Sequence, residues 1–268
     1  MNLIDILRAV KEGKMDLETA EQQARSLGFV SYTDIAKLDS HRKNRTGVIE
    51  AVLADCKTPE DVVEIARVMV AESKRALITR VSSGHLDALK QAFGQDKLEW
   101  NSRARTVVIH DGTPVPRTGG VVGIVSAGTA DIPAAEEARV VASEMGCETV
   151  VVYDVGVAGI HRLIPAMHKL KAMKTGAIVV AAGREGTLPT IVSGLVDVPV
   201  IGLPVSTGYG AGGGGKAALL AMLQSCSPLA VVNIDAGFVA GAYAARIANM
   251  IAAAYTHGKD ARTDQEGE

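Results

Sequence analysis

Hydrophobic and polar positions follow different patterns in the two parts of the chain, and the change lies near Asp111. Before it, apolar residues recur at helical spacing in residues 3–27 and 58–74, the second opening with TPED: a cap, an early proline and first-turn acids. Residues 76–111 combine a short strand pattern, a helix and an alternating segment. We therefore expect a smaller helical α+β domain over residues 1–117.

From Gly119 onward, apolar β-type runs alternate regularly with helical stretches, which is the pattern of repeated βαβ units. This predicts an α/β domain with a mainly parallel sheet over residues 118–256, followed by a polar tail, residues 257–268, that we expect to be disordered. The last helix is rich in Ala and Gly, so it covers its own sheet or packs at a subunit interface. The five runs are VVGIVSAG, TVVVYDVG, AIVVAAG, VPVIGLPVS and LAVVNID.

Composition narrows the class of ligand. The 268 residues are 47% hydrophobic and 3% aromatic, and the net charge is -2. The sequence contains no basic stripe of the kind that binds nucleic acid, so a small-molecule ligand is favoured. No apolar run reaches the roughly 18 uninterrupted residues of a membrane span, and the first residues lack a signal-peptide pattern, which predicts a cytoplasmic protein. The three cysteines are too widely spaced for a disulfide framework or a thiolate zinc cluster.

Each predicted strand ends in residues suited to binding. In open parallel sheets, ligands bind outside the carboxyl ends of the strands, so these ends together define the expected site. Alternatives stay open at each position, because an aspartate here also serves as an ordinary helix cap. The candidates are Ser126, Gly128, Thr129 and Asp131 after the first strand, Asp154 after the second, Gly183, Arg184 and Glu185 after the third, and Asp235 after the fifth.

The fourth strand leads into the glycine-rich stretch STGYGAGGGGK, which contains Gly208, Tyr209, Gly210 and Lys216. It fits the phosphate-binding pattern G-x-x-x-x-G-K, yet Ala217 stands where a hydroxyl would hold magnesium. It also fits the G-x-G-x-x-G dinucleotide pattern, although that pattern belongs after a first strand. We interpret the stretch as a loop that lets part of a dinucleotide approach the backbone closely.

Long strings of this sequence resemble the LarB family. They include GIVSAGTADIPAAEEA, YDVGVAGIHRL, AAGREGTLPTIVSGLVDVPVIGLPVSTGYGAGGGGKAALLAMLQSCSPLAVVNIDAGFVAGAYAARIA and, upstream, LDSHRKNRTG, so the resemblance runs from about Leu38 to Tyr255. It implies a PurE-like three-layer catalytic domain and carboxylation and hydrolysis of nicotinic acid adenine dinucleotide, with CO2 or bicarbonate as co-substrate. That reaction begins the biosynthesis of the nickel-pincer nucleotide cofactor. A homo-oligomer, by resemblance an octamer, is also implied.

The resemblance assigns roles to single residues. Cys226 is the implied nucleophile, which adds to carbon 4 of the pyridinium ring, and Glu185 is the implied base. Cleaving the phosphoanhydride usually requires a divalent ion or basic groups, so Mg2+ is expected. The candidate metal ligands are Asp131, Asp154 and Asp235, although no spacing singles out a metal site, and Lys216 or Arg184 could neutralise phosphate instead.

Some features favour other functions. His41, Arg42 and Arg45 of the upstream segment could reach the adenylate end of the substrate or form a solvated face. A PurE-type aminoimidazole ribonucleotide carboxylase or mutase is disfavoured, because Thr187 stands where the PurE loop has a histidine. A nicotinamide-dependent oxidoreductase and a non-catalytic nucleotide-binding regulator are the remaining alternatives.

Overall fold

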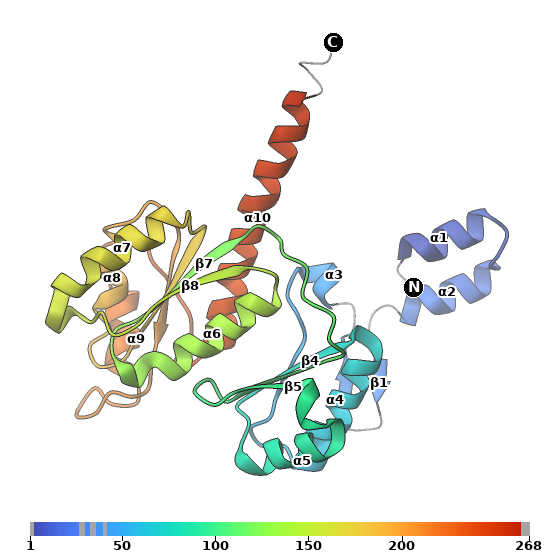
Figure 1. Cartoon of the computed structure of the whole chain (residues 1–268), viewed down its shortest axis with the longest axis horizontal. Coiled ribbons are helices and arrows are strands. Elements are labelled where there is room, and N and C mark those ends of the chain that lie inside the picture. The colour runs from blue at the N-terminus through green and yellow to red at the C-terminus, as the bar shows by residue number, and fades with distance from the viewer. Residues whose placement is uncertain (1–2, 27–29, 33–35, 40–41, 264–268) are drawn as a thin grey trace. The chain divides into compact units, whose positions relative to one another are not determined.

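The computed structural model describes residues 3–26, 30–32, 36–39 and 42–263 (Figure 1). The chain divides into two compact units, one of Met1–Trp100 with Val107–Thr113 and one of Asn101–Thr106 with Pro114–Glu268. The domain boundary expected after residue 117 stays a prediction.

The first unit contains helices and a mixed sheet, as expected. Its four-stranded sheet has the order β3-β4-β6-β5, in which β3 and β4 are parallel and β4 and β6 antiparallel. Helix α4 starts where TPED predicts, since Thr58 accepts a hydrogen bond from the Asp61 amide and the Asp61 side chain bonds the Thr58 amide. The elements are α1 (Leu3–Lys11), α2 (Leu17–Ser26), β1 (Val30–Tyr32), β2 (Ala36–Leu38), α3 (Arg42–Thr46), β3 (Ala51–Leu53), α4 (Pro59–Ser73), β4 (Arg75–Thr79), α5 (Ser83–Phe93), η1 (Gln95–Lys97), β5 (Leu98–Asn101) and β6 (Thr106–His110).

The second unit is built on a five-stranded parallel sheet, as the alternating pattern predicts. The strand order is β11-β10-β9-β7-β8, and each neighbouring pair is parallel. The elements are β7 (Val121–Ser126), η2 (Thr129–Asp131), α6 (Ile132–Glu144), β8 (Glu148–Val152), η3 (Val157–Arg162), α7 (Leu163–Ala172), β9 (Ala177–Ala182), α8 (Leu188–Ser193), β10 (Val200–Pro204), α9 (Lys216–Leu223), β11 (Ala230–Val231) and α10 (Gly237–Thr263).

Helices cover both faces of this sheet and complete three layers. Helices α7, α8 and α9 share one apolar core with residues such as Ile178 and Val180, while α6 and α10 pack against the other face. Figure 1 shows α7, α8 and α9 on one side of the strands and α6 with α10 on the other. Right-handed crossovers require this arrangement, because the chain moves from β7 to β8 in one direction and then reverses to β9 and β10.

The apolar helix α10 packs closely on α6. At Gly241 a side chain would lie 2.3 Å from the Ala138 carbonyl oxygen, so glycine allows the two backbones to approach. Residues Gly237–Tyr255 are long and apolar enough to cross a membrane by length and composition, and in this structure the helix packs against α6 and strand β9 of the second unit. The helix continues to Thr263, past the expected start of the polar tail at residue 257, and residues 264–268 lie outside the described residues.

Candidate active site

The candidate site lies at the carboxyl edge of the second unit's sheet. Numbered within this unit, the strand order is 2-1-3-4-5, so the direction in which the chain adds successive strands across the sheet reverses between β7 and β9. The connections after these two strands leave toward opposite faces, which opens a crevice at the position where doubly wound sheets bind ligands. The segments after β7, β9 and β10 therefore carry the residues most suited to chemistry.

Asp131 joins these three segments. Its Oδ2 accepts a hydrogen bond of 2.8 Å from the Gly128 amide, and its Oδ1 accepts bonds of 3.0 Å from the Gly183 amide and 3.1 Å from the Thr207 hydroxyl. The side chain is buried, and a buried carboxylate is tolerated when donors surround it. Asp131 therefore fixes the relative positions of the strand ends on both sides of the crevice.

The surroundings of Asp131 also affect its ionisation. Burial raises the pKa of this carboxyl above its ordinary value, and the nearby charge of Glu185 acts in the same direction, while the three hydrogen bonds oppose the rise. A carboxylate fully engaged by its own chain is better suited to positioning than to proton transfer. We therefore assign it a structural role in the crevice.

The loop after β9 presents Arg184 and Glu185 to solvent. The Gly186 amide donates to the Gly183 carbonyl at 2.9 Å, closing a turn with both charged residues at its centre. Arg184 has a left-handed backbone (φ 48°), which is unfavourable for a residue with a long side chain and occurs often at functional sites. Its guanidinium lies over the Tyr209 ring, 4.6 Å from the centroid, so this loop and the glycine-rich loop contact each other.

The glycine-rich loop connects β10 to α9. Two of its amides are used internally, since Gly213 donates to the Gly210 carbonyl and Gly214 to the Gly208 carbonyl, and the Ala217 amide at the start of α9 donates to the Gly212 carbonyl. These amides are then not directed at a phosphate as in a nucleotide-binding P-loop. Gly208 lies directly against the Arg184 backbone, where a side chain would approach the Arg184 nitrogen to 3.1 Å, while Lys216 is exposed at the start of α9.

Ser126 and Asp154 connect the ends of β7 and β8. The buried Ser126 hydroxyl accepts a bond of 3.2 Å from the Asp154 amide, and the Asp154 carboxylate pairs with Arg162 at 2.7 Å. Thr129 is exposed at the start of the turn that ends in Asp131. This end of the site is thus held by its own polar contacts.

Asp235 connects the ends of β10 and β11. Its Oδ1 accepts a 2.9 Å bond from the Ser206 amide, and its own amide donates to the Pro204 carbonyl. The three aspartates considered as metal ligands are thus engaged separately, and no group of three His, Cys, Asp or Glu side chains among the described residues could hold a metal ion. A magnesium centre made of this chain's carboxylates does not fit this arrangement.

Cys226 lies at the opposite edge of the sheet from Glu185 within one chain. Helix α9 begins at the carboxyl edge and runs back along the sheet, and Cys226 follows it, four residues before β11 begins beside Ile201. The Ser193 hydroxyl, at the end of α8, donates to the Pro228 carbonyl, which anchors this segment at the edge where the strands start. The thiol itself is exposed.

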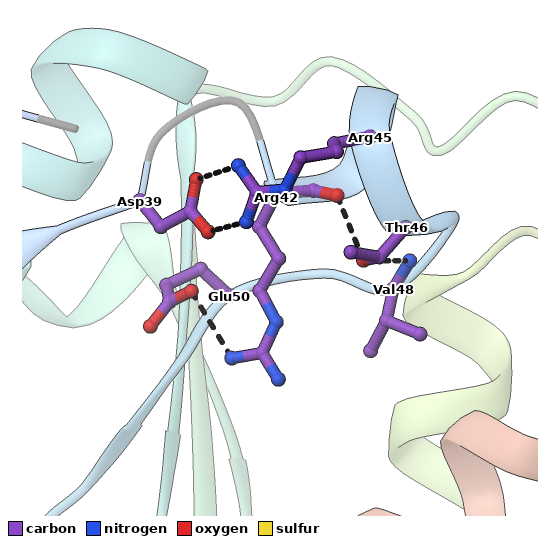
Figure 2. Close-up of polar contacts among 6 residues, drawn as sticks. All are labelled: Asp39, Arg42, Arg45, Thr46, Val48 and Glu50. Atoms are coloured by element: carbon purple, nitrogen blue, oxygen red, sulfur yellow. Dashed lines mark hydrogen bonds and ion pairs between the residues drawn. The ribbon is translucent and has the colours of Figure 1, made fainter. Parts of the chain in front are cut away.

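The basic residues of the upstream segment are held in ion pairs within the first unit. Arg42 pairs with Glu50 at 3.2 Å, and Arg45 pairs with Asp39 through both of its terminal nitrogens (Figure 2). The Asp39 hydrogen bond and charge raise the pKa of Arg45, which keeps it cationic. His41 lies outside the described residues, and the role of this segment in substrate binding stays a prediction.

Three residues of the site escaped the sequence analysis. Thr207 bonds Asp131, Ser206 bonds Asp235 and Arg162 bonds Asp154. Their positions two or three residues after a strand, or in the following helix, were visible in the sequence. The partners of Thr207 and Ser206 were not, because these two contacts join segments that follow different strands, while Arg162 and Asp154 lie in the same segment after β8.

Comparisons with known proteins agree with this architecture. Residues 30–111 match the LarB/PurE-like N-terminal domain, and residues 121–266, just over half of the chain, match the AIR carboxylase domain. An uncharacterized protein of Methanocaldococcus jannaschii is 39% identical over 256 residues, covering 93% of this chain and 98% of the relative. The N5-carboxyaminoimidazole ribonucleotide mutase of Pyrococcus horikoshii is 32% identical over 133 residues, covering 47% of this chain and 71% of that enzyme.

The order of these two domains confirms the resemblance inferred from the sequence strings. It also identifies the second unit with its parallel sheet as a domain of the carboxylase and mutase type. The chain belongs to the LarB family.

Proposed function

We propose that the protein carboxylates carbon 5 of the pyridinium ring of nicotinic acid adenine dinucleotide and hydrolyses its phosphoanhydride. The products are AMP and pyridinium-3,5-dicarboxylic acid mononucleotide, the first intermediate of the nickel-pincer nucleotide cofactor. A cytoplasmic location and assembly into a homo-oligomer, by resemblance an octamer, are part of the same proposal.

One observation carries the proposal: a solvent-exposed carboxylate, Glu185, stands at the switch point of a carboxylase-type domain on a turn whose base is fixed by Asp131. A general base must be held in place and must reach the substrate. The neighbouring Arg184 and Lys216 supply positive charge for a phosphate or carboxylate on the same ligand. A nicotinamide-dependent oxidoreductase is less well supported, because the glycine-rich loop follows the fourth strand of the unit.

The first half of the proposed reaction makes carbon 5 nucleophilic. The Cys226 thiolate forms a bond to carbon 4, and the ring nitrogen accepts the displaced electron pair, which gives a dihydropyridine with enamine character. Carbon 5 then donates its electron pair to CO2 and forms the new carbon–carbon bond. The positive charge of the bound pyridinium favours the thiolate before this addition.

The second half restores the aromatic ring. Glu185 takes the proton from carbon 5, the enamine re-forms, and the carbon 4–sulfur bond breaks with both electrons returning to sulfur. Water then cleaves the phosphoanhydride and releases AMP. No step of the proposed reaction passes through a metal ion, because Asp131, Asp154 and Asp235 are each bonded to groups of this chain. The expected Mg2+ requirement is tested by adding or withholding the ion.

The related mutase suggests purine chemistry as a second candidate. In this chain Thr187 stands at the start of α8, where the PurE loop has its proton-carrying histidine. A threonine hydroxyl does not exchange protons near neutral pH as an imidazole does. We therefore expect no conversion of aminoimidazole ribonucleotides.

The proposal is tested by incubating the protein with nicotinic acid adenine dinucleotide and 13C-bicarbonate, with and without Mg2+. We expect release of AMP and a mononucleotide that carries one labelled carboxyl group, both measured by mass spectrometry. The Cys226→Ser variant should lose at least about a hundredfold in carboxylation rate, because an alcohol is a much weaker nucleophile than a thiolate.

Cys56→Ser is the matched control, since Cys56 is also exposed but belongs to the first unit. It should retain wild-type activity. Undiminished carboxylation by the Cys226→Ser variant would refute the covalent mechanism, and an aminoimidazole product would favour the second candidate.

A further inference from the structure

A second group of reactive side chains lies in the first unit, at the carboxyl edge of the parallel strands β3 and β4. After β4 the chain passes through Arg80, which has a left-handed backbone (φ 56°), and enters α5 at its N-cap residue Ser82. Ser82 is exposed, while His85, three residues further on, is buried. A serine exposed on a tight strand-to-helix turn is the arrangement that presents the nucleophile in one large class of hydrolases.

The side chains of Ser82 and His85 are bonded to each other. Ser82 Oγ lies 2.8 Å from His85 Nδ1, and His85 Nε2 lies 3.0 Å from the Lys57 carbonyl oxygen. Because a carbonyl oxygen only accepts hydrogen bonds, Nε2 carries the ring proton and Nδ1 is the acceptor. The Ser82 hydroxyl therefore donates to Nδ1, which is the bond that a nucleophilic serine makes to its base, and the Lys57 carbonyl orients that base.

Helix capping explains only part of this arrangement. In the capping box of α5, the His85 amide donates to Ser82 Oγ at 3.3 Å and the Ser82 amide donates to His85 Nδ1 at 3.2 Å. Helix α4 begins with the same kind of box, but among the described residues the side chains of Thr58 and Asp61 bond only backbone amides. The α5 box has an additional bond between its two side chains, and one of them is an imidazole, which can take up a proton.

Two backbone amides are open beside the serine. Ser83 and Gly84 are the first two residues of α5, and their amides have no acceptor in the part of the chain that the structure describes. Amides at the start of a helix favour negative charge. The amide of the residue after a nucleophilic serine often stabilises the oxyanion of the tetrahedral intermediate. Ser82 is therefore accompanied by both a base and donors for an oxyanion.

We infer that Ser82 and His85 form a second catalytic site, which hydrolyses carboxylic esters through an acyl-serine intermediate. Ser82 Oγ bonds to the carbonyl carbon as its proton moves to His85 Nδ1, and the amides of Ser83 and Gly84 hold the oxyanion. The bond from this carbon to the leaving oxygen then breaks, and His85 gives its proton to the departing alcohol. Water repeats the sequence on the acyl-serine, which releases the carboxylic acid and restores the hydroxyl.

The surroundings of the site indicate a small acyl group. Ser82, Ser83 and Gly84 are all exposed, and so are Lys57 and Thr58 of the neighbouring loop. That loop is close, since a side chain at Gly84 would lie 3.9 Å from the Pro59 ring at the start of α4. An acyl chain of many carbons has no apolar wall to pack against at this polar edge. The site goes beyond the proposed carboxylation, because it uses none of the residues assigned to that reaction.

Labelling with a fluorophosphonate tests the inference, because this reagent forms a stable phosphonate ester on a serine that a base activates. In the full-length protein we expect the label on Ser82, identified by peptide mass spectrometry. Ser82→Asn keeps an N-cap side chain and His85→Gln keeps a capping box, so both variants should fold. Ser82→Asn should carry no label at this position, and His85→Gln should lower the labelling rate at Ser82 by at least about a hundredfold.

Thr58→Ser is the matched control, because it places a serine at the N-cap of α4, in a capping box whose other side chain is the carboxylate of Asp61. We expect no label at residue 58 of this variant. Labelling of Ser82 that is no faster than labelling of residue 58, or that His85→Gln leaves undiminished, would overturn the inference.

Hydrolysis of 4-nitrophenyl acetate gives a second readout. A Cys56→Ser/Cys226→Ser background removes the two exposed thiols, which also react with this ester. In this background we expect release of 4-nitrophenol with a transient acetyl group on Ser82, and a loss of at least about tenfold in rate on adding His85→Gln. The background lacks the proposed nucleophile of carboxylation, so this result is separate from the outcome of the dinucleotide assay. Absence of acetylation at Ser82 would contradict the inference even if the wild-type protein carboxylates the dinucleotide.

Discussion

At the scale of single residues, solvent exposure distinguishes Cys147 from Cys226, which the sequence composition cannot do. Cys147 is buried between β8 and α10, and its thiol donates to the Asn249 side chain at 3.0 Å. Burial raises the pKa of this thiol to about 11, so it is protonated at neutral pH. Cys226 is exposed and can meet a ligand.

We predict that an alkylating reagent near pH 8 modifies Cys226 and Cys56 in the folded protein and leaves Cys147 unmodified. The physical reason is the combined effect of burial and the raised pKa at Cys147. Peptide mass spectrometry at successive times measures the three rates. Labelling of Cys147 should begin when urea unfolds the second unit, and equal rates for all three thiols before unfolding would contradict the assignment.

At the scale of elements, the position of the Glu185 turn depends on its contact with α9. Gly186 has a left-handed backbone (φ 64°), and a side chain there would meet the Ala218 backbone. Such a contact cannot be relieved by rotating a side chain. The turn can therefore lie against the helix only because Gly186 has no Cβ atom.

Gly186→Ala should therefore displace the turn and reduce both stability and carboxylation. Gly214→Ala is a closely matched control, because Gly214 has nearly the same backbone angle (φ 65°) and no atom within 4 Å of an added Cβ. Both variants should lose about 1 kcal/mol from the left-handed backbone. The additional loss at Gly186 measures the contact, by urea denaturation, and equal losses in the two variants would show that the contact is unimportant.

The sequence predicted most elements of the second unit because burial on both faces leaves continuous apolar runs in parallel strands. Strands β7 to β10 and the helices between them agree with these runs. The last run, LAVVNID, forms a strand of two residues, Ala230–Val231. It pairs with β10 on one side and lies at the edge of the sheet, where fewer partners extend the ladder.

At the scale of the whole molecule, a polar cluster around α6 links distant parts of the second unit. Glu136 accepts hydrogen bonds from Arg139, Tyr153 and Asn101. Burial alone would raise the pKa of Glu136, but these three donors outweigh it and lower the pKa. A lowered pKa in the folded state contributes stability above the unfolded value near 4.5, and this stability is lost as the pH falls through the folded value.

We predict that the wild-type protein loses stability below about pH 4.5 partly through this group. Glu136→Gln should be less stable at neutral pH by roughly 1–3 kcal/mol, because it weakens charge-assisted hydrogen bonds. Its unfolding free energy should also vary less with pH in the acid range than that of the wild-type protein. Urea denaturation at pH 7 and pH 4 measures both effects, and parallel pH profiles would contradict the role assigned to Glu136.

The sequence by itself determined the family, the βαβ architecture and most of the strand-end residues. Local periodicity fixes each element, and parallel strands bring their carboxyl ends to one edge by topology alone. Ser126, Asp131, Gly183 and Glu185 could be named as one set for this reason.

The tertiary structure alone decided which of these residues touch and which lie apart. Asp131 could be read as a helix cap, a metal ligand or a substrate contact, and its bonds to Gly183 and Thr207 show that it joins three segments. The position of Cys226, at the far end of α9 from Glu185, follows from the direction of that helix across the sheet. Contacts between segments distant in the chain depend on packing in three dimensions, which no local pattern of residues encodes.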